Sequence, residues 1–231
     1  MSEKLLVPSI EKRMSALVEL ARRNFTDNSL AKESGPPTIT ISREFGCEGF
    51  PVAEKLKALF EEKTGHTWGI MDRDLLAEAA KNHNLSEEIF KTLGERHRFL
   101  DDMLSTFSSR WQSERDYFKL LSKQIVALAT AGNVIIVGRG SSIVTQKMPN
   151  CFHFRIVAPS DFKVKAIAAR MGIATEEAAE IVRKRQKMRD AFIHDFLGKD
   201  VTDPTWYHLI FNNEKNTPER IATTMFRYVT G

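Results

Sequence analysis

Three short segments of the sequence combine arginine, glycine and acidic side chains in a way that suits the binding of phosphate groups. They are residues 42–49 (SREFGCEG), 72–74 (DRD) and 138–140 (GRG). Each lies at the end of a run that reads as a β-strand, and the first of them leads into a helix. Backbone N–H groups and the dipole at a helix N-terminus favour anions. The segments therefore indicate a phosphate site, although a plain strand–helix turn explains residues 42–49 equally well.

These segments can lie together if the strands before them form one parallel sheet. Short β-branched or apolar runs predict five strands, near residues 38, 67, 133, 152 and 208. Helical patterns separate the strands, which is typical of a parallel sheet covered on both faces. Such sheets bind ligands beyond the carboxyl ends of their strands. We therefore predict an α/β fold with the first strand in the centre and the loop 43–49 within reach of Arg139.

The chain of 231 residues divides into two expected parts. Residues 1–36 are predicted to form an N-terminal helix and linker, and residues 37–231 a domain with a helical insertion at about 86–131. Apolar residues at helical spacing mark the N-terminal helix, and they are Ile10, Met14, Leu17 and Val18. We expect this stripe to pack on the body or on a second copy of the chain, as in a homodimer; the alternative is an ordinary surface helix.

Composition excludes several classes of protein. Apolar residues make up 42% of the chain and charged residues 28%, as in a folded globular protein. The 34 basic and 30 acidic residues leave a net charge of +4, which argues against a nucleic-acid partner. No apolar run approaches the ~18 residues of a membrane span, so we expect no membrane partner. With only Cys47 and Cys151, the chain fits a reducing cytoplasm.

The order of the segments resembles the cytidylate kinase-like family of P-loop proteins. The matching stretches are TITISREFG (38–46), MDRDLL (71–76), VIIVGR (134–139), APSDF (158–162) and YHLIFN (207–212), within a resemblance that covers about 38 to 228. This resemblance implies a three-layer P-loop kinase-like fold with a five-stranded parallel sheet, helices on both faces, a helical cap and a lid at about 174–200. It also implies transfer of a phosphoryl group from a nucleoside triphosphate to a nucleoside monophosphate or similar small acceptor, with Mg²⁺ and ATP.

The resemblance also assigns residues to this chemistry. The implied catalytic residues neutralise phosphate charge and are Arg43, Arg139, Arg185 and Arg189. The implied nucleotide- or phosphate-binding residues are Ser42, Arg43, Glu44, Gly46, Cys47, Gly49, Asp72 and Gly138. No residue is assigned to a metal. In the basic run 183–190, the arginines fall where a lid grips phosphates, whereas a charged run on a helix is otherwise a solvated face.

Several residues depart from the family pattern. The Walker sequence G-x-x-x-x-G-K-[ST] is absent, and Glu48-Gly49-Phe50 replaces Gly-Gly-Arg. Two unit charges ~4 Å apart repel by ~4 kcal/mol at an effective dielectric constant of ~20. Glu48 must therefore point outward or hold a cation, or the loop does not bind triphosphate in the usual way. Pro51 offers no hydroxyl to Mg²⁺, Gln186 replaces an aspartate and His208 replaces another. These departures favour an alternative function, a non-catalytic nucleotide-binding or regulatory protein.

Individual residues also have structural interpretations. Asp72 either binds ligand or caps the following helix. Arg139 either meets a ligand or pairs with a carboxylate, and Glu44 either binds at the site or holds Arg43 or Arg139 in place. Cys47 lies near a helix N-terminus, where thiol pKa values fall, but it has no histidine or second cysteine nearby in the sequence. His153, inside a predicted strand, is expected to be structural.

Overall fold

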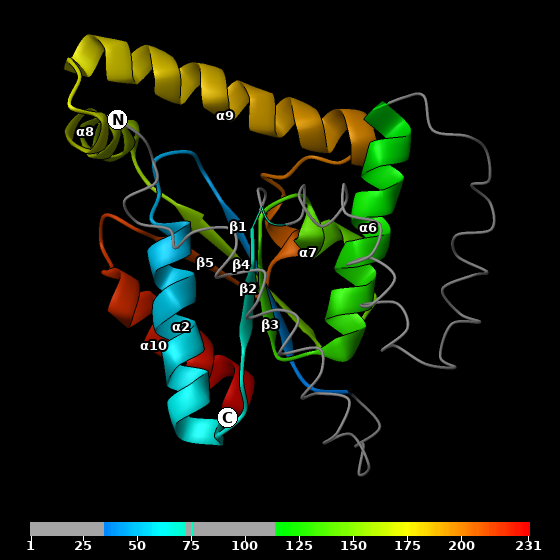
Figure 1. Cartoon of the computed structure of the whole chain (residues 1–231). Helices are drawn as coiled ribbons and strands as arrows, with labels where there is room; N and C mark the ends of the chain where they lie inside the picture. The colour runs from blue at the N-terminus through cyan, green and yellow to red at the C-terminus, as the bar shows by residue number, and fades with distance from the viewer. Residues whose placement is uncertain (1–34, 73–74, 76–113) are drawn as a thin grey trace.

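The computed structural model of the chain describes residues 35–72, 75 and 114–231 (Figure 1). The predicted N-terminal helix and residues 86–113 of the predicted insertion lie outside these described residues. So do Arg73 and Asp74, which follow the second strand. No helix in the described part is long and apolar enough to cross a membrane.

The centre of the described structure is a sheet of five parallel strands. These are β1 (Thr38–Arg43), β2 (Gly69–Met71), β3 (Val134–Val137), β4 (Cys151–Val157) and β5 (Leu209–Asn212). Their order across the sheet is β2-β3-β1-β4-β5. All pairs are parallel, with Ile39 opposite both Ile135 and Phe152. The prediction of five parallel strands with the first in the centre is confirmed.

Helices cover both faces of this sheet. The described helices are α2 (Gly49–Thr64), α6 (Glu114–Ala131), α7 (Ser141–Val144), α8 (Ser160–Met171), α9 (Thr175–Leu197), the 3-10 turn η4 (Pro204–Trp206) and α10 (Pro218–Thr230). On one face, α2 and α10 pack on Ile39, Ile41 and Phe154, whereas α6 packs on Val134 and Ile136 on the other (Figure 1). Because helices bury the side chains on both faces of the sheet, the sequences of the strands are almost wholly apolar. The predicted three-layer fold is confirmed.

Local signals in the sequence set several helix ends. Helix α2 ends at Gly65, whose φ of 70° lies in the left-handed region. Helix α10 begins with Pro218, and the Thr217 side chain accepts a hydrogen bond from the Arg220 N–H, which is the arrangement of a helix N-cap. These ends fix where the chain enters and leaves the sheet.

Helix α9 lies across the end of the sheet at which the strands finish (Figure 1). Near its C-terminal end, Phe192 and Phe196 pack on Phe118 of α6, with ring centroids 5.5 and 5.1 Å from that of Phe118. Near its N-terminal end, α9 and α8 enclose Phe45, which follows β1. The helix is therefore anchored on both sides of the residues that follow β1 and β3.

Candidate phosphate-binding site

The loop between β1 and α2 is shaped by a glycine and by a lysine from another helix. Gly46 has a φ of +98°, a conformation that favours glycine. A Cβ atom at Gly46 would lie 2.8 Å from the Cβ atom of Lys163 on α8. The loop therefore turns tightly against α8, and a larger residue at this position would push the two apart.

Most backbone N–H groups of this loop donate to oxygen atoms of the protein. The Glu44 N–H donates to Ile156 O at 3.1 Å, and the Cys47 N–H donates to Glu44 O at 3.3 Å. The Phe45 N–H donates to the Gln186 side chain on α9, and the Glu48 N–H to the Asn213 side chain after β5, each at 2.8 Å. In P-loops such N–H groups face phosphate oxygens. Here, two side-chain amide oxygens accept from them instead.

The same asparagine accounts for the acidic residue in the loop. The Asn213 Nδ2 group donates to Glu48 Oε2 at 3.1 Å, and Asn213 itself is buried. The sequence left open whether Glu48 points outward, holds a cation or prevents the usual binding of triphosphate; in the structure, its carboxylate accepts a hydrogen bond from an uncharged amide. This amide binds both the backbone and the side chain of Glu48, which fixes the start of α2 on the β5–α10 connection.

Arg43 lies between two predicted glycines of the site. A Cβ atom at Gly49 would lie 3.0 Å from Arg43 Cγ, and one at Gly138 would overlap Arg43 Nη1. The Gly138 N–H donates to Ile41 O at 2.9 Å, which joins the ends of β1 and β3. The structure thus brings together the loop after β1 and the segment before Arg139, as the sequence predicted.

Two further predicted arginines lie at this edge of the sheet. The Arg139 guanidinium lies 4.7 Å from the ring centre of Phe192 on α9. Arg189, also on α9, donates from Nη1 to Arg43 O at 3.4 Å and lies 5.1 Å from the ring centre of Phe45. A cation over an aromatic face is held in place but keeps its charge. The structure therefore holds Arg43, Arg139 and Arg189 along one edge.

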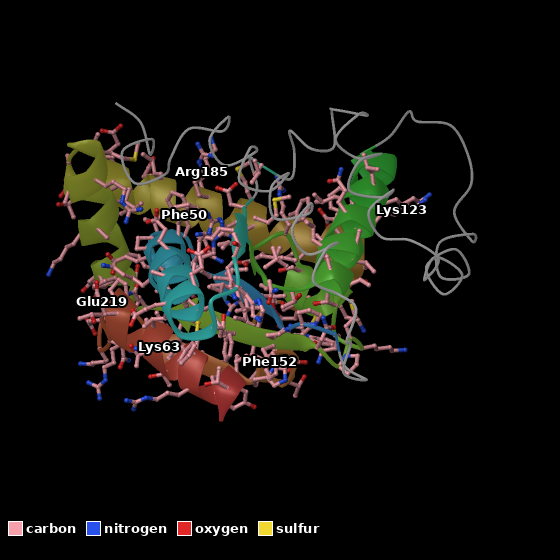
Figure 2. The ribbon with its side chains drawn as sticks, turned by 60° about the horizontal axis from the view of Figure 1, so that its bottom comes forward. Phe50, Lys63, Lys123, Phe152, Arg185 and Glu219 are labelled. Carbon is pink, nitrogen blue, oxygen red and sulfur yellow. The ribbon has the colours of Figure 1, made fainter. Side chains whose placement is uncertain are left out.

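The fourth predicted arginine is placed differently. Arg185 lies on α9 with an exposed side chain (Figure 2). Among the described residues, its side chain makes no hydrogen bond or ion pair to the loop 43–49. Next to it, Gln186 borders a groove of about 610 Å³ between α9 and residues 199–201. Arg183, Lys187, His194 and Lys199 line this groove along with Asp190 and Asp200, so its wall carries both signs of charge.

Of the two interpretations of Glu44, the one in which it holds Arg43 or Arg139 in place is wrong. Glu44 Oε2 accepts a hydrogen bond from Lys163 Nζ at 2.6 Å, and Glu44 Oε1 lies 3.9 Å from Arg155 Nη2. The carboxylate turns this way because β4 and α8 place two cations behind the loop. Arg155 is 4% exposed and also donates to Ser42 Oγ at 3.2 Å. The Ser42 hydroxyl and the Glu44 carboxylate thus both have partners within the protein.

Sequence reasoning missed the two cations that bind Glu44. Arg155 stands in a strand of otherwise mostly apolar residues, and a charge in such a strand needs a partner when it is buried. Lys163 directly follows the APSDF stretch at residues 158–162. The first of these signals could have identified the buried cation, but neither indicates that its partner is Glu44.

The expected lowering of the Cys47 pKa is also wrong. Burial raises the pKa of the Cys47 thiol to about 11; the nearby Glu44 carboxylate also raises it, whereas Lys163 and Arg189 lower it. Desolvation of the thiolate outweighs the dipole at the start of α2. Cys47 therefore carries a protonated thiol at neutral pH, and its place in the loop is that of a small buried side chain.

Asp72 and His153 have the structural contacts that their alternative interpretations require. Asp72 Oδ1 accepts from the Leu75 N–H at 3.0 Å, which is the geometry of a helix cap. His153 Nδ1 lies 2.8 Å from Thr40 Oγ1, and burial lowers the pKa of His153 to about 4. His153 is therefore an uncharged residue of the core.

The described residues fit a polyphosphate better than they fit a metal ion. Three arginines lie at the edge where an anion would bind, whereas Glu44 and Glu48 already have partners. Within the described ranges, no three His, Cys, Asp or Glu side chains are grouped so that they could hold a metal ion. Mg²⁺ commonly keeps several waters and binds phosphate oxygens together with few protein ligands. The site thus fits Mg²⁺ that arrives with a nucleotide.

Comparisons with known proteins agree with this geometry. The chain is 24% identical over 183 residues to the cytidylate kinase of Pyrococcus horikoshii, which covers 79% of this chain and 83% of the relative. Its fold is similar to the crystal structure of an uncharacterized protein from Eubacterium ventriosum, with a TM-score of 0.64, 21% identity, and coverage of 84% of this chain and 97% of the other. The model of the cytidylate kinase-like family matches residues 38–215, more than half of the chain. The chain therefore belongs to the cytidylate kinase-like family.

Proposed function

We propose that this chain is a phosphotransferase that moves a phosphoryl group from a nucleoside triphosphate to a nucleoside monophosphate or similar small acceptor. The observation that carries the proposal is the arrangement of Arg43, Arg139 and Arg189 around a strand–loop–helix turn at the carboxyl edge of the sheet. Membership of the cytidylate kinase-like family supports it, and the Pyrococcus relative makes cytidylate the first acceptor to test.

The residues would act mainly through position and charge. Phosphoryl transfer needs little covalent chemistry from the protein and much stabilisation of charge on the phosphate oxygens. Arg43 and Arg189 lie at the loop and would neutralise the donor phosphates, and Arg139 would orient the acceptor. ATP with Mg²⁺ would supply the phosphoryl group. Arg185, exposed on α9, would reach a bound nucleotide from the solvent side.

A reducing cytoplasm is the compartment we propose for this activity. Both cysteines of the chain, Cys47 and Cys151, are free and buried. Burial raises the pKa of the Cys151 thiol, like that of Cys47, to about 11. Protonated and unpaired thiols require no oxidising environment.

A second candidate function rests on the N–H groups of the loop 43–49 that already donate hydrogen bonds within the protein. Because Gln186 and Asn213 accept hydrogen bonds from loop N–H groups, and Glu48 adds a negative charge, the chain could bind nucleotide without turning it over. Such a protein would act as a non-catalytic regulator on a kinase fold. The two candidates differ in one measurable quantity, the rate of product formation.

The experiment that tests the proposal combines titration and product detection. ATP-Mg²⁺ and a panel of nucleoside monophosphates are titrated by calorimetry, and each pair is then assayed for nucleoside diphosphate. We expect Arg139→Ala to lower turnover by ~10²–10³-fold, the effect of losing one preorganised charged donor. The matched control is Arg227→Ala, which removes an exposed arginine from α10 and should leave turnover unchanged.

Three results are possible. Turnover that falls with Arg139→Ala alone supports catalysis. Measurable nucleotide binding with no product from any pair, in a folded protein, decides for the regulatory alternative. Absence of binding to every nucleotide contradicts both candidates.

A further inference from the structure

Helix α9 contacts the phosphate loop through two residues that are nearly one helical turn apart. Gln186 Oε1 accepts a hydrogen bond from the Phe45 N–H at 2.8 Å. Arg189 donates to Arg43 O and covers the ring of Phe45. These contacts join residues separated by 141 and 146 positions in the sequence. Helix α9 therefore lies in direct contact with the loop.

The orientation of the Gln186 amide is fixed by its second hydrogen bond. Gln186 Nε2 donates to Asp190 Oδ1 at 2.8 Å, one turn along the same helix. Because the carboxylate of Asp190 accepts and the backbone of Phe45 donates, only one orientation of the amide satisfies both partners. Its oxygen therefore faces the loop.

We propose that Gln186 is a latch that occupies the Phe45 N–H in place of a phosphate oxygen and must be displaced when a triphosphate binds. The proposal rests on the function proposed above for this site and concerns its regulation. The groove of about 610 Å³ borders Gln186 and Asp190, so the released side chain has room to turn away from the loop. In the absence of nucleotide, the latch satisfies a backbone donor that would otherwise lack a protein partner.

The size of the effect follows from the exchange of acceptors. A charged phosphate oxygen makes a stronger hydrogen bond than a neutral amide oxygen, so the nucleotide can displace the latch. The affinity of the nucleotide is nevertheless reduced by the net value of the bond that is broken. A typical neutral hydrogen bond corresponds to about 2- to 10-fold in affinity.

The experiment compares two substitutions at one position. Gln186→Ala removes the competing oxygen and should raise affinity for ATP-Mg²⁺, and for inorganic tripolyphosphate, by about 2- to 10-fold. Gln186→Glu keeps an acceptor for the Phe45 N–H but adds a negative charge, and should lower affinity for both probes. The matched control is Met188→Ala, which changes a residue that is 58% exposed on the same helix. It should leave affinity unchanged.

A second measurement reports the latch without nucleotide. Hydrogen exchange at the Phe45 amide, followed by NMR, should be faster in Gln186→Ala than in the unsubstituted protein and in Met188→Ala, because the acceptor is missing. An unchanged exchange rate would show that this hydrogen bond does not form in solution, and the latch proposal would be rejected.

The outcomes separate the latch from the proposed function. If the unsubstituted chain binds ATP-Mg²⁺ and Gln186→Ala binds it no better, the latch is wrong and the proposed function stands. If only Gln186→Ala binds, the latch is supported and the unsubstituted chain is not a constitutive kinase. If neither binds either probe, both the latch and the proposed function are wrong.

Discussion

Gly138 offers a direct test of whether Arg43 belongs to the phosphate site. Its φ of +86° lies in the left-handed region, and a Cβ atom added there would overlap Arg43 Nη1. We consider the substitution Gly138→Ala. The added methyl group would displace the end of a flexible side chain and would leave the hydrogen bond from the Gly138 N–H to Ile41 O in place.

The cost in stability can be separated from the effect on Arg43. An alanine in the left-handed conformation costs about 1–2 kcal/mol relative to glycine. For a chain of this size, 1 kcal/mol lowers Tm by about 2–4 °C. Gly65 is the matched control, because it has a φ of +70° and no heavy atom within 4 Å of an added Cβ. We expect Gly65→Ala and Gly138→Ala to lower Tm by similar amounts.

The two variants should differ in nucleotide binding. Loss of a hydrogen bond from a charged group corresponds to about 1.5–3 kcal/mol, or roughly 10- to 100-fold in affinity. Titration calorimetry with ATP-Mg²⁺ should therefore show weaker binding by Gly138→Ala and unchanged binding by Gly65→Ala. In an Arg43→Ala background, Gly138→Ala should have no further effect on affinity. If Gly138→Ala binds like the unsubstituted chain, Arg43 does not act on phosphate from its place beside Gly138.

Two further predictions concern charge. Glu48→Gln keeps an oxygen for Asn213 Nδ2 but removes a negative charge. The repulsion between this charge and a phosphate charge ~8 Å away corresponds to ~2 kcal/mol at an effective dielectric constant of ~20. Titration should therefore show triphosphate binding up to ~30-fold tighter. Glu62→Gln, at the exposed end of α2, is its control, and equal affinity in both variants would contradict the reasoning. Burial lowers the pKa of His153 from 6.5 in the unfolded chain to about 4 in the folded chain. Between these two pH values, the unfolded chain carries a proton on His153 that the folded chain does not. The free energy of unfolding should therefore fall by about 3 kcal/mol as pH decreases from about 6.5 to about 4. Thermal unfolding across this window should show a shallower loss for His153→Asn, and parallel curves would refute the assignment.

Much of the fold could be predicted because its signals are local. The runs at Thr38–Arg43 and Val134–Val137 are short, β-branched and bounded by turn residues, so they identify buried strands without further information. Thr217 and Pro218 mark a helix start by chemistry that acts within one turn. The parallel order then follows from the helices between strands. These features depend on residues that are close in the sequence.

The site was predictable only in outline. The sequence indicates that loop 43–49 and Gly138 meet at one edge, because parallel strands end together. It does not indicate which side chains complete the loop, because Gln186, Asn213 and Lys163 reach it from 119 to 165 positions away. The error on Cys47 has the same origin. The rule for helix N-termini is local, whereas burial by other elements determines the pKa of the Cys47 thiol.

The departures of this chain from the family pattern are connected through its amide side chains. A phosphate loop with no anion ordinarily leaves N–H groups to water, and a carboxylate in that loop would repel the ligand. In this chain Asn213 binds both the backbone and the carboxylate of Glu48, while Gln186 accepts from the Phe45 N–H. Most N–H groups of the loop therefore have protein acceptors without ligand, and a triphosphate that uses the Phe45 or Glu48 N–H must replace a protein oxygen rather than water. Whether the arginines at this edge outweigh that exchange decides how tightly a triphosphate binds. Substitutions at Glu48 and Gln186 test this balance, and product formation by the same variants then separates a kinase from a regulator.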